Sequence, residues 1–204
     1  GYNTDSITAN GYELGGVNTT VDVQAGPYLR WYQVNGTPTY GGNLRLNGVG
    51  TGGVLINDSG SGNPAVVLNG NVTLDSDAKI TGANSGRFNV YGNLSGEHVL
   101  TWEQGALAST IAGPVDLTGL TKTGGGILSF TSDHIAIDSL LASAGTVNFN
   151  PFAESDFSGT LAGTASVTKT GVGTLVLSGP NFFGSIGGTF SFGGPGTNLG
   201  AIRL

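Results

Sequence analysis

Short apolar runs, separated by Gly, Asn, Asp and Ser, recur along the whole chain. Runs of this length that partly alternate apolar and polar residues are typical of β-strands. The pattern predicts strands at residues 19–25, 43–48, 53–58, 65–75, 87–92 and 145–150. The best helix candidate, residues 139–144, is too short to be stable alone, and Gly recurs too often elsewhere for a long helix. The expected fold class is therefore all-β.

Two near-copies of one segment occur in the second half of the chain. They are "LTKTGGGILSF" at residues 120–130 and "VTKTGVGTLVL" at residues 167–177, which begin 167 − 120 = 47 positions apart. Weaker echoes, such as Asn71 and Asn93 after Gly, recur at about half this interval, which matches one coil of a parallel β-helix. The repeats therefore predict a β-solenoid of roughly nine coils, with the two strong copies two coils apart and like residues stacked.

A β-sandwich is the alternative fold. Its strands come every 8 to 12 residues and are joined by antiparallel hairpins. The Asn-Gly pairs of this chain favour that architecture, whereas the long fixed interval between the copies favours the solenoid.

The aromatic residues divide the chain unevenly, because Tyr and Trp crowd the first 40 positions and Phe dominates the end. This distribution predicts an N-terminal cap or assembly segment at residues 1–40, a solenoid body at 41–186 and a Gly-rich strand segment at 187–204.

Composition excludes several functional classes. The chain of 204 residues has 38 Gly and only 10% charged residues, with a formal net charge of −6. Nucleic-acid binders concentrate Lys and Arg on one face, so nucleic acid is not an expected partner. Cys and Met are absent, which fits an exposed location, and the missing leader suggests a mature chain after signal removal. No apolar run is long enough to span a membrane.

The "TKTGxG" loops are candidates for phosphate binding, since backbone N–H groups of Gly-rich loops hold anions. A P-loop, however, places its Lys after the glycines and before a helix, whereas here Lys comes first and a strand follows. We therefore interpret each loop as a corner, with Gly supplying positive φ and with Thr and Lys at the solvated outer edge.

Acidic pairs are the remaining candidates for chemistry. Asp75 and Glu97, and likewise Asp116 and Asp138, are 22 positions apart, so a 22-residue coil would stack them as in a glycosidase or a cation site. With 13 acidic residues in the chain, such coincidences are expected.

His98 and His134 are interpreted as solvated strand-edge residues. Four glycosylation sequons, at Asn18, Asn57, Asn71 and Asn93, reflect the abundance of Asn and Thr. The sequence therefore predicts no catalytic residue, cofactor or metal site.

The second copy of the repeat continues beyond its turn. Its pattern is carried by Val167, Lys169, Gly171, Gly173, Leu175, Leu177, Gly179, Asn181 and Phe183. The first copy supplies the front half of the pattern, with Leu120, Lys122, Gly124, Gly126 and Leu128. This pattern resembles the autotransporter-associated β-strand repeat of bacterial surface proteins. The resemblance implies a right-handed parallel β-helix that is exported and displayed outside the bacterial cell, with a structural rather than a catalytic role.

The leading functional hypothesis is a structural surface or matrix protein that self-associates head-to-tail into filaments. A solenoid exposes strand edges at both ends, and no amphipathic cap helix is evident in the sequence. The expected self-association residues are Tyr28, Trp31, Tyr32, Phe190, Phe192, Leu199, Ile202 and Leu204. The alternative is an adhesin or polysaccharide-cleaving β-helix whose partner is a surface glycan.

Overall fold

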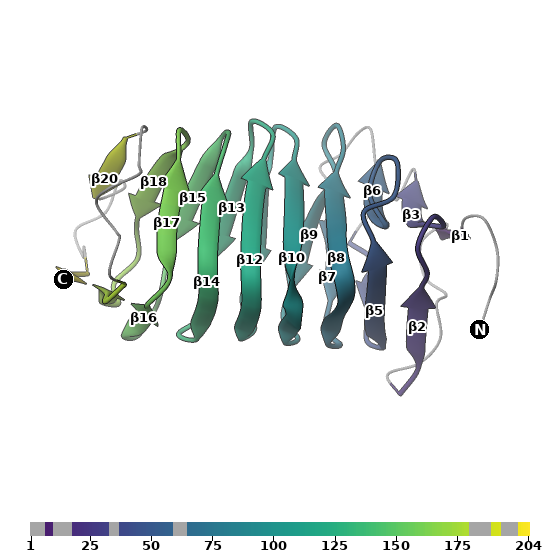
Figure 1. Ribbon diagram of the computed structural model, residues 1–204, viewed down its shortest axis with the longest axis horizontal. Helices are drawn as coiled ribbons and strands as arrows, with labels where there is room; N and C mark the ends of the chain where they lie inside the picture. Colours follow the sequence, from purple (N-terminus) through teal and green to yellow (C-terminus); the bar gives the residue numbers. More distant parts are fainter. Residues whose placement is uncertain (1–6, 10–17, 33–36, 59–64, 180–188, 193–199) are drawn as a thin grey trace.

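The chain folds into an elongated stack of β-strand coils (Figure 1). The computed structural model describes residues 7–9, 18–32, 37–58, 65–179, 189–192 and 200–204. In these ranges the regular structure consists of strands, and no helix is long and apolar enough to cross a membrane. The first described strand, residues 7–9, and the last, residues 202–203, lie at opposite ends of the stack.

Sheet A forms the front layer in Figure 1 and is entirely parallel. Its strands are β1 (Ile7–Ala9), β2 (Thr20–Val23), β3 (Leu29–Tyr32), β5 (Asn43–Gly48), β6 (Leu55–Asp58), β8 (Val72–Gly82), β10 (Leu94–Gln104), β12 (Val115–Thr123), β14 (Ile135–Ala142) and β17 (Thr160–Gly163). The long strands β8, β10 and β12 run the full height of the layer (Figure 1).

Sheet B forms the layer behind it, with one strand per coil. Its strands are β4 (Thr39–Tyr40), β7 (Ala65–Leu68), β9 (Arg87–Val90), β11 (Ala108–Ile111), β13 (Ile127–Phe130), β15 (Thr146–Phe149), β18 (Ser166–Lys169) and β20 (Phe190–Phe192). A small sheet C contains β16 (Ser155–Phe157), β19 (Leu175–Leu177) and β21 (Ile202–Arg203).

The predicted β-solenoid is confirmed. Parallel pairing between successive coils excludes the antiparallel sandwich. The stack makes about 7 turns, close to the nine coils expected. In the central coils equivalent residues are 19 to 22 positions apart, as in the paired Ala108–Ile127 and the bonded pair Asn93–Asn71. The coil that follows β5 is longer, since Asn71 bonds to Asn43 over 28 positions, whereas β2 and β5 are offset by 23.

Alternation along each strand builds the core between the two layers. Every second residue points inward and is buried, as in the pattern of β9 and β15. Equivalent side chains therefore form columns along the stack. Aromatic rings fill much of this space: Phe130 and Phe149 of adjacent coils stack with centroids 5.6 Å apart, and Phe88 meets Trp102 edge-on at 6.4 Å.

Residues 139–144 and the N-terminal segment 1–40 both contribute strands to this stack. Residues 139–144, the best helix candidate, lie largely in strand β14, because Leu140 and Ala142 face the core at strand spacing. In the N-terminal segment 1–40, β2 pairs with β5 and β3 with β6. The described strands of this segment are therefore part of the solenoid.

Candidate functional site

Lys122 lies inside the molecule, at the turn that ends β12. In register it stands between Trp102 and Ala142 of the neighbouring coils, and it has no exposed surface. Its Nζ donates hydrogen bonds to Thr123 O at 2.6 Å and Gly124 O at 2.8 Å. A third bond reaches Ala144 O of the next coil at 3.2 Å. The three carbonyl oxygens satisfy the three ammonium N–H donors, although burial lowers the pKa of Lys122 to about 8.

Lys169 repeats this geometry at the end of β18. The side chain is 2% exposed, and Nζ donates to Thr170 O at 2.6 Å and Gly171 O at 2.9 Å. Burial lowers its pKa as well. The expectation that these lysines solvate the outer edge of a corner is therefore wrong. Each Lys is two positions after an inward-facing Leu or Val, so strand alternation turns it toward the core.

The two copies of the motif lie at opposite turns of the coil. The glycines after Lys122 connect sheet A to sheet B, whereas those after Lys169 connect sheet B to sheet C. Lys122 pairs with Ala142, and Ala142 with Gly163, so two coils advance the chain by 163 − 122 = 41 positions rather than 47. The copies therefore do not stack on one another. The motif is a local turn that serves at either end of a coil.

Gly124 shows why the motif needs glycine. Its φ is 73°, and a Cβ there would lie 2.1 Å from Gln104 O of the preceding coil. An L-residue would meet both a strained backbone and a clash with main-chain atoms. The next residue, Gly125, is exposed, and a Cβ at that position would have no atom within 4 Å. The loop is thus held at Gly124 by the preceding coil, while Gly125 faces open space.

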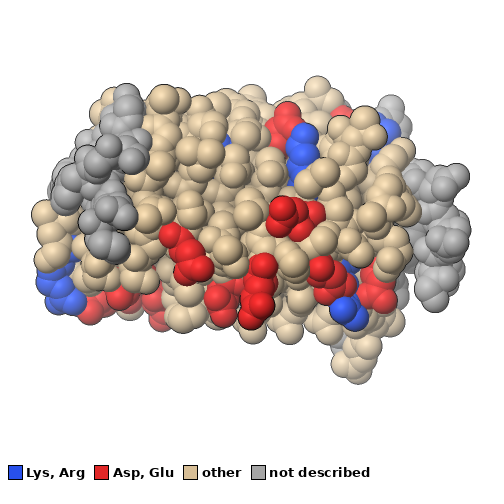
Figure 2. Space-filling view, viewed as in Figure 1, with Lys and Arg blue, Asp and Glu red and all other residues tan. Residues whose placement is uncertain are grey.

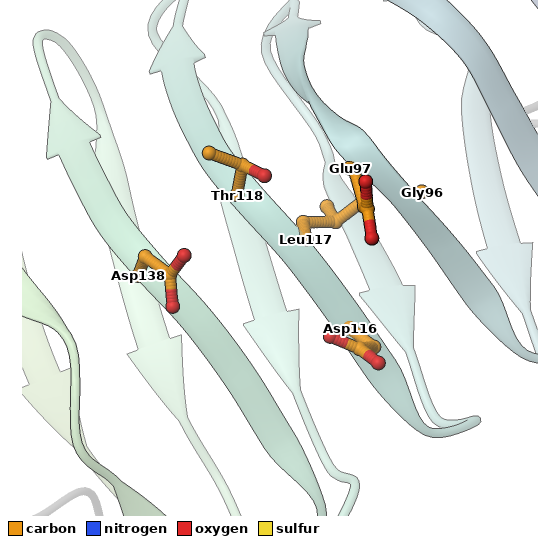
Figure 3. Close-up of a pocket in the computed structure, with 6 residues that line it drawn as sticks. All are labelled: Gly96, Glu97, Asp116, Leu117, Thr118 and Asp138. Carbon is orange, nitrogen blue, oxygen red and sulfur yellow. The ribbon is translucent and has the colours of Figure 1, made fainter.

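An acidic stripe runs along the lower part of sheet A (Figure 2). The residues that form it are Asp22, Asp75, Glu97, Asp116 and Asp138, from β2, β8, β10, β12 and β14. Between β10 and β14 the stripe borders a shallow depression of about 220 Å³. Glu97, Asp116 and Asp138 line it together with Gly96, Leu117 and Thr118 (Figure 3).

The register of this region corrects one of the two predicted carboxylate pairs. Asp116 is paired with Ala136, so Asp138 falls beside Thr118 and not beside Asp116. Asp75 and Glu97 do occupy corresponding positions of β8 and β10, because the pairs on both sides of them are 22 positions apart. Between β10 and β12 the offset is 21 positions up to Gly96 and 20 from Val99 onward, and between β12 and β14 it is 20, so a constant period of 22 fails there.

The depression lacks the features of a glycosidase site. Glu97, Asp116 and Asp138 are all exposed, whereas the general acid of such enzymes is a carboxyl shielded from water. No Lys, Arg or His of the described chain lines the depression. In the described ranges no three His, Asp or Glu side chains are grouped so as to hold a metal ion.

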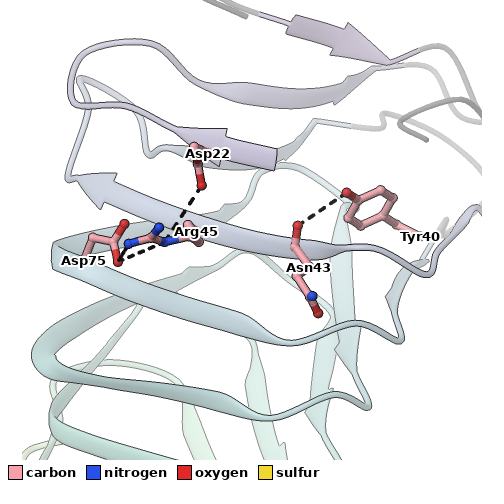
Figure 4. A network of polar contacts seen from close by, with 5 residues as sticks. All are labelled: Asp22, Tyr40, Asn43, Arg45 and Asp75. Atoms are coloured by element: carbon pink, nitrogen blue, oxygen red, sulfur yellow. Dashed lines mark hydrogen bonds and ion pairs between the residues drawn. The ribbon is translucent and has the colours of Figure 1, made fainter. Parts of the chain in front are cut away.

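Arg45 joins three coils at the N-terminal end of the stripe (Figure 4). Its Nη2 lies 2.9 Å from Asp75 Oδ1, and its Nε lies 3.8 Å from Asp22 Oδ1. The hydrogen bond and charge of Asp75, with the charge of Asp22, raise the pKa of Arg45. Nearby, Tyr40 Oη donates to Asn43 O at 3.4 Å. These contacts cross-link β2, β5 and β8 and have a structural role.

The histidines occupy surface positions, as expected. His98 Nδ1 lies 3.9 Å from Asp77 Oδ1, and the His98 side chain is 37% exposed. His134 is exposed, and its main chain pairs with that of Asp156. No nucleophile is bonded to either imidazole in the described part of the chain.

The expected self-association residues fall into four groups. Trp31 is 2% exposed and packs edge-on against Phe88 at 5.8 Å, so it is a core residue and not a contact for a second copy. Tyr28 and Ile202 are partly exposed, and Leu204 is 75% exposed. Phe190 and Phe192 lie in β20, and Tyr32 ends β3. Leu199 lies outside the described residues, as do Asn181 and Phe183 of the repeat pattern.

One buried polar network was not predicted from the sequence. Gln104 has no exposed surface, and its Oε1 accepts hydrogen bonds from Ser109 Oγ and, at 3.4 Å, from Trp102 Nε1. Its Nε2 donates to Gly86 O at 3.0 Å. The network ties the turn between β10 and β11 to that of the preceding coil. A Gln two positions after an inward Trp was the available signal, because strand alternation turns both toward the core.

Asparagines form a ladder at the turns from sheet B to sheet A. Asn71 donates its N–H to Asn43 Oδ1 at 2.9 Å, and Asn93 donates its N–H to Asn71 Oδ1 at 3.1 Å. The Gly before each Asn is tightly stacked, since a Cβ at Gly92 would lie 2.1 Å from Gly70 O.

The sequon at Asn57 is unsuitable for glycosylation, because Asn57 has no exposed surface and its Nδ2 donates to Arg87 O.

Comparison with known proteins gives no relative. The chain matches no protein-family model, no curated protein and no solved structure. Its function therefore has to be inferred from its own geometry.

Proposed function

We propose that this chain is a non-enzymatic structural protein that stacks head-to-tail with copies of itself into filaments or a matrix. The proposal places it outside the cell or on a bacterial surface. That location is supported by the resemblance of the "TKTGxG" repeat to passenger regions of bacterial surface proteins and by the absence of Cys and Met. A passenger-type adhesin scaffold would use the same stacking.

The observation that carries the proposal is the outward main chain of the last strand. Leu175 donates its N–H to Ala201 O at 2.9 Å, with Leu175 and Ile202 in register. Successive residues of a parallel strand bond to opposite neighbours, so the N–H and C=O of Ile202 point away from β19. In the described ranges β21 pairs with β19 alone. Unpaired groups of this kind are a template for another strand.

Strand β2, the first described strand of its column, offers the complementary edge. Sheet C continues the lower half of sheet A, because His134, which precedes β14, bridges to Asp156 of β16. Strands β2 and β21 thus stand at the two ends of one column. Asn43 donates its N–H to Thr19 O at 2.7 Å, so the N–H and C=O of Thr20 face away from β5.

Charge favours head-to-tail contact over contact between like ends. Asp22 of β2 is 47% exposed, and Arg203 of β21 is 61% exposed. A copy that docks its β21 on the β2 of another copy brings these opposite charges to one junction. Because the two edges differ, the contact repeats without closing and yields an open filament.

Light scattering coupled to size-exclusion chromatography, over a concentration series, tests this function. The wild type is expected to grow in mass with concentration. Ile202→Pro removes the outward N–H while the bonds of Ala201 and Arg203 to β19 are kept. Ile202→Ala is its matched control, because it loses the same apolar contact but keeps the N–H. Assembly by Ile202→Ala but not by Ile202→Pro supports edge pairing, and a wild type that stays monomeric at every concentration overturns it.

A further inference from the structure

Arg87 differs from the other basic residues of the chain. All seven Lys and Arg residues lie in the described ranges. Six of them have partners: Arg30 with Asp58, Arg45 with Asp22 and Asp75, Lys79 with Glu103, Arg203 with Glu154, and Lys122 and Lys169 with backbone carbonyls. The Arg87 side chain makes no ion pair or hydrogen bond with any described residue, and its Nε is buried without a partner there.

The guanidinium in this position has a buried hydrogen-bond donor without an acceptor. Its Nε–H has lost contact with water without gaining an acceptor, which costs about 1–3 kcal/mol. The terminal nitrogens of this guanidinium have no hydrogen-bond partner among the described residues either, so an anionic oxygen that binds them would pair with the charge. The unpaired charge therefore points to an anionic ligand.

Two further side chains on the same strand complete a strip for such a ligand. Arg87 and Asn89 lie on the outward face of β9, because Phe88 and Val90 point into the core. The ladder continues to Tyr91, whose N–H donates to Leu68 O at 2.8 Å and whose side chain is 55% exposed. At about 3.3 Å per residue, the strip from Arg87 to Tyr91 spans about 13 Å.

The strands beside the strip carry smaller side chains. Arg87 is in register with Ala65 on β7, and Asn89 is in register with Val67 on β7 and Thr110 on β11, whose side chains are shorter than that of Asn. Ala112 follows β11 at the level of Tyr91. The longer side chains of the strip therefore stand above their neighbours and are accessible to a ligand that lies along β9.

The electrostatic setting favours an anion at this strip. Arg87 is the only charged residue on the outward face of the described sheet B strands, since Lys169 of β18 points inward. The acidic stripe lies on sheet A, on the other layer of the stack (Figures 1 and 2). An anion at β9 thus meets one cation and no nearby carboxylate from the described strands of its own sheet.

We propose that Arg87, Asn89 and Tyr91 bind an acidic oligosaccharide that contains uronic acid residues. The guanidinium binds a uronate carboxylate, the Asn89 amide bonds to ring hydroxyls, and the Tyr91 ring stacks on a pyranose face. A nucleic acid or another densely charged polyanion fits poorly, because the strip offers one cation and the whole chain carries a net charge of −6. This site rests on sheet B alone and is independent of the proposed stacking of the ends.

Isothermal titration calorimetry with tetragalacturonate tests the site, with neutral galactotetraose as the uncharged probe. The wild type is expected to bind tetragalacturonate with a Kd below about 1 mM. Arg87→Gln and Tyr91→Ala are each expected to weaken binding by about tenfold or more. Lys79→Gln is the matched control, because it removes one positive charge from sheet A and is expected to leave binding unchanged. Thermal melts of all variants confirm that they are folded.

Three outcomes would overturn the proposal. They are no saturable binding of tetragalacturonate by the wild type, equal affinity of Arg87→Gln and the wild type, and equal affinity for the neutral oligosaccharide. Weakening by Arg87→Gln and Tyr91→Ala, with Lys79→Gln unchanged, would place the ligand on the strip.

Discussion

Lys122 of one coil donates a hydrogen bond to Ala144 O of the next coil, 3.2 Å away. The same ammonium closes its own turn through Thr123 O and Gly124 O. One side chain thus joins the end of β12, the glycine turn and the following coil. What looks like a ligand-binding loop in the sequence is an internal clamp between coils.

Replacing Lys122 by Met tests this clamp. Met fills a similar volume but leaves the three carbonyl oxygens without their buried donor, so Lys122→Met is expected to lower the free energy of unfolding by about 1–3 kcal/mol. Lys79→Met is the control, because the Lys79–Glu103 pair is on the surface and such pairs contribute less than about 1 kcal/mol. Urea denaturation measures both. Equal stability of the two variants would contradict the clamp.

The stability of the protein should rise with pH in the alkaline range. Burial lowers the pKa of folded Lys122 to about 8, against 10.5 for an ordinary lysine. Between these values the unfolded chain holds a proton that the folded chain has released, so the free energy of unfolding increases with pH. Below about pH 8 both states are protonated, and Lys122 gives no slope. Urea denaturation at several pH values in this range should show that the free energy of unfolding rises less steeply with pH in Lys122→Met than in the wild type. An equal rise in both would contradict the assignment to Lys122.

Gly124 and Gly125 offer a matched pair within one turn. Gly124→Ala is expected to cost about 2–4 kcal/mol, since Ala must adopt a positive φ and displace Gln104 O of the preceding coil. Gly125→Ala meets no atom within 4 Å and should change stability by less than about 0.5 kcal/mol. Thermal melting compares the stability losses of the two variants. Similar losses in both would show that the turn is not held in this conformation.

The asparagine ladder predicts a smaller effect. Asn71→Ala removes the acceptor of the Asn93 N–H and should cost about 1 kcal/mol. Asn71→Asp keeps an acceptor oxygen and should recover part of that loss. Asn69→Ala, two positions earlier at an exposed site, is the control. Urea denaturation of the three variants would refute the ladder if Asn69→Ala and Asn71→Ala were equally stable.

The fold was predictable because the strand signal is local. Apolar alternation and Gly-Asn turns placed strands at residues 43–48 and 87–92, where β5 and β9 lie. The 22-residue echo of Asn71 and Asn93 marks one coil, and the two residues bond across it. Register was harder, because coil length varies along the chain, from 28 positions between Asn43 and Asn71 to 19 between Ala108 and Ile127. The mispaired Asp116 and Asp138 result from this drift.

The candidate sites were less predictable than the fold. The lysines of the repeat were expected at the surface because charged residues are rarely buried. The short turn, however, brings enough carbonyl oxygens to Lys122 to satisfy its ammonium group inside the core. Arg87 gave no signal in the sequence. Its importance comes from the lack of a partner among the described residues, and only the arrangement of all seven basic residues shows that.

Electron microscopy of the concentrated protein is the strictest test of whether the ends of the stack pair with one another. We expect filaments whose long axis is the solenoid axis, with a strand spacing of about 4.8 Å that continues across the junctions between subunits. Rods of a single short length at every concentration, or particles joined side by side, would contradict end-to-end pairing.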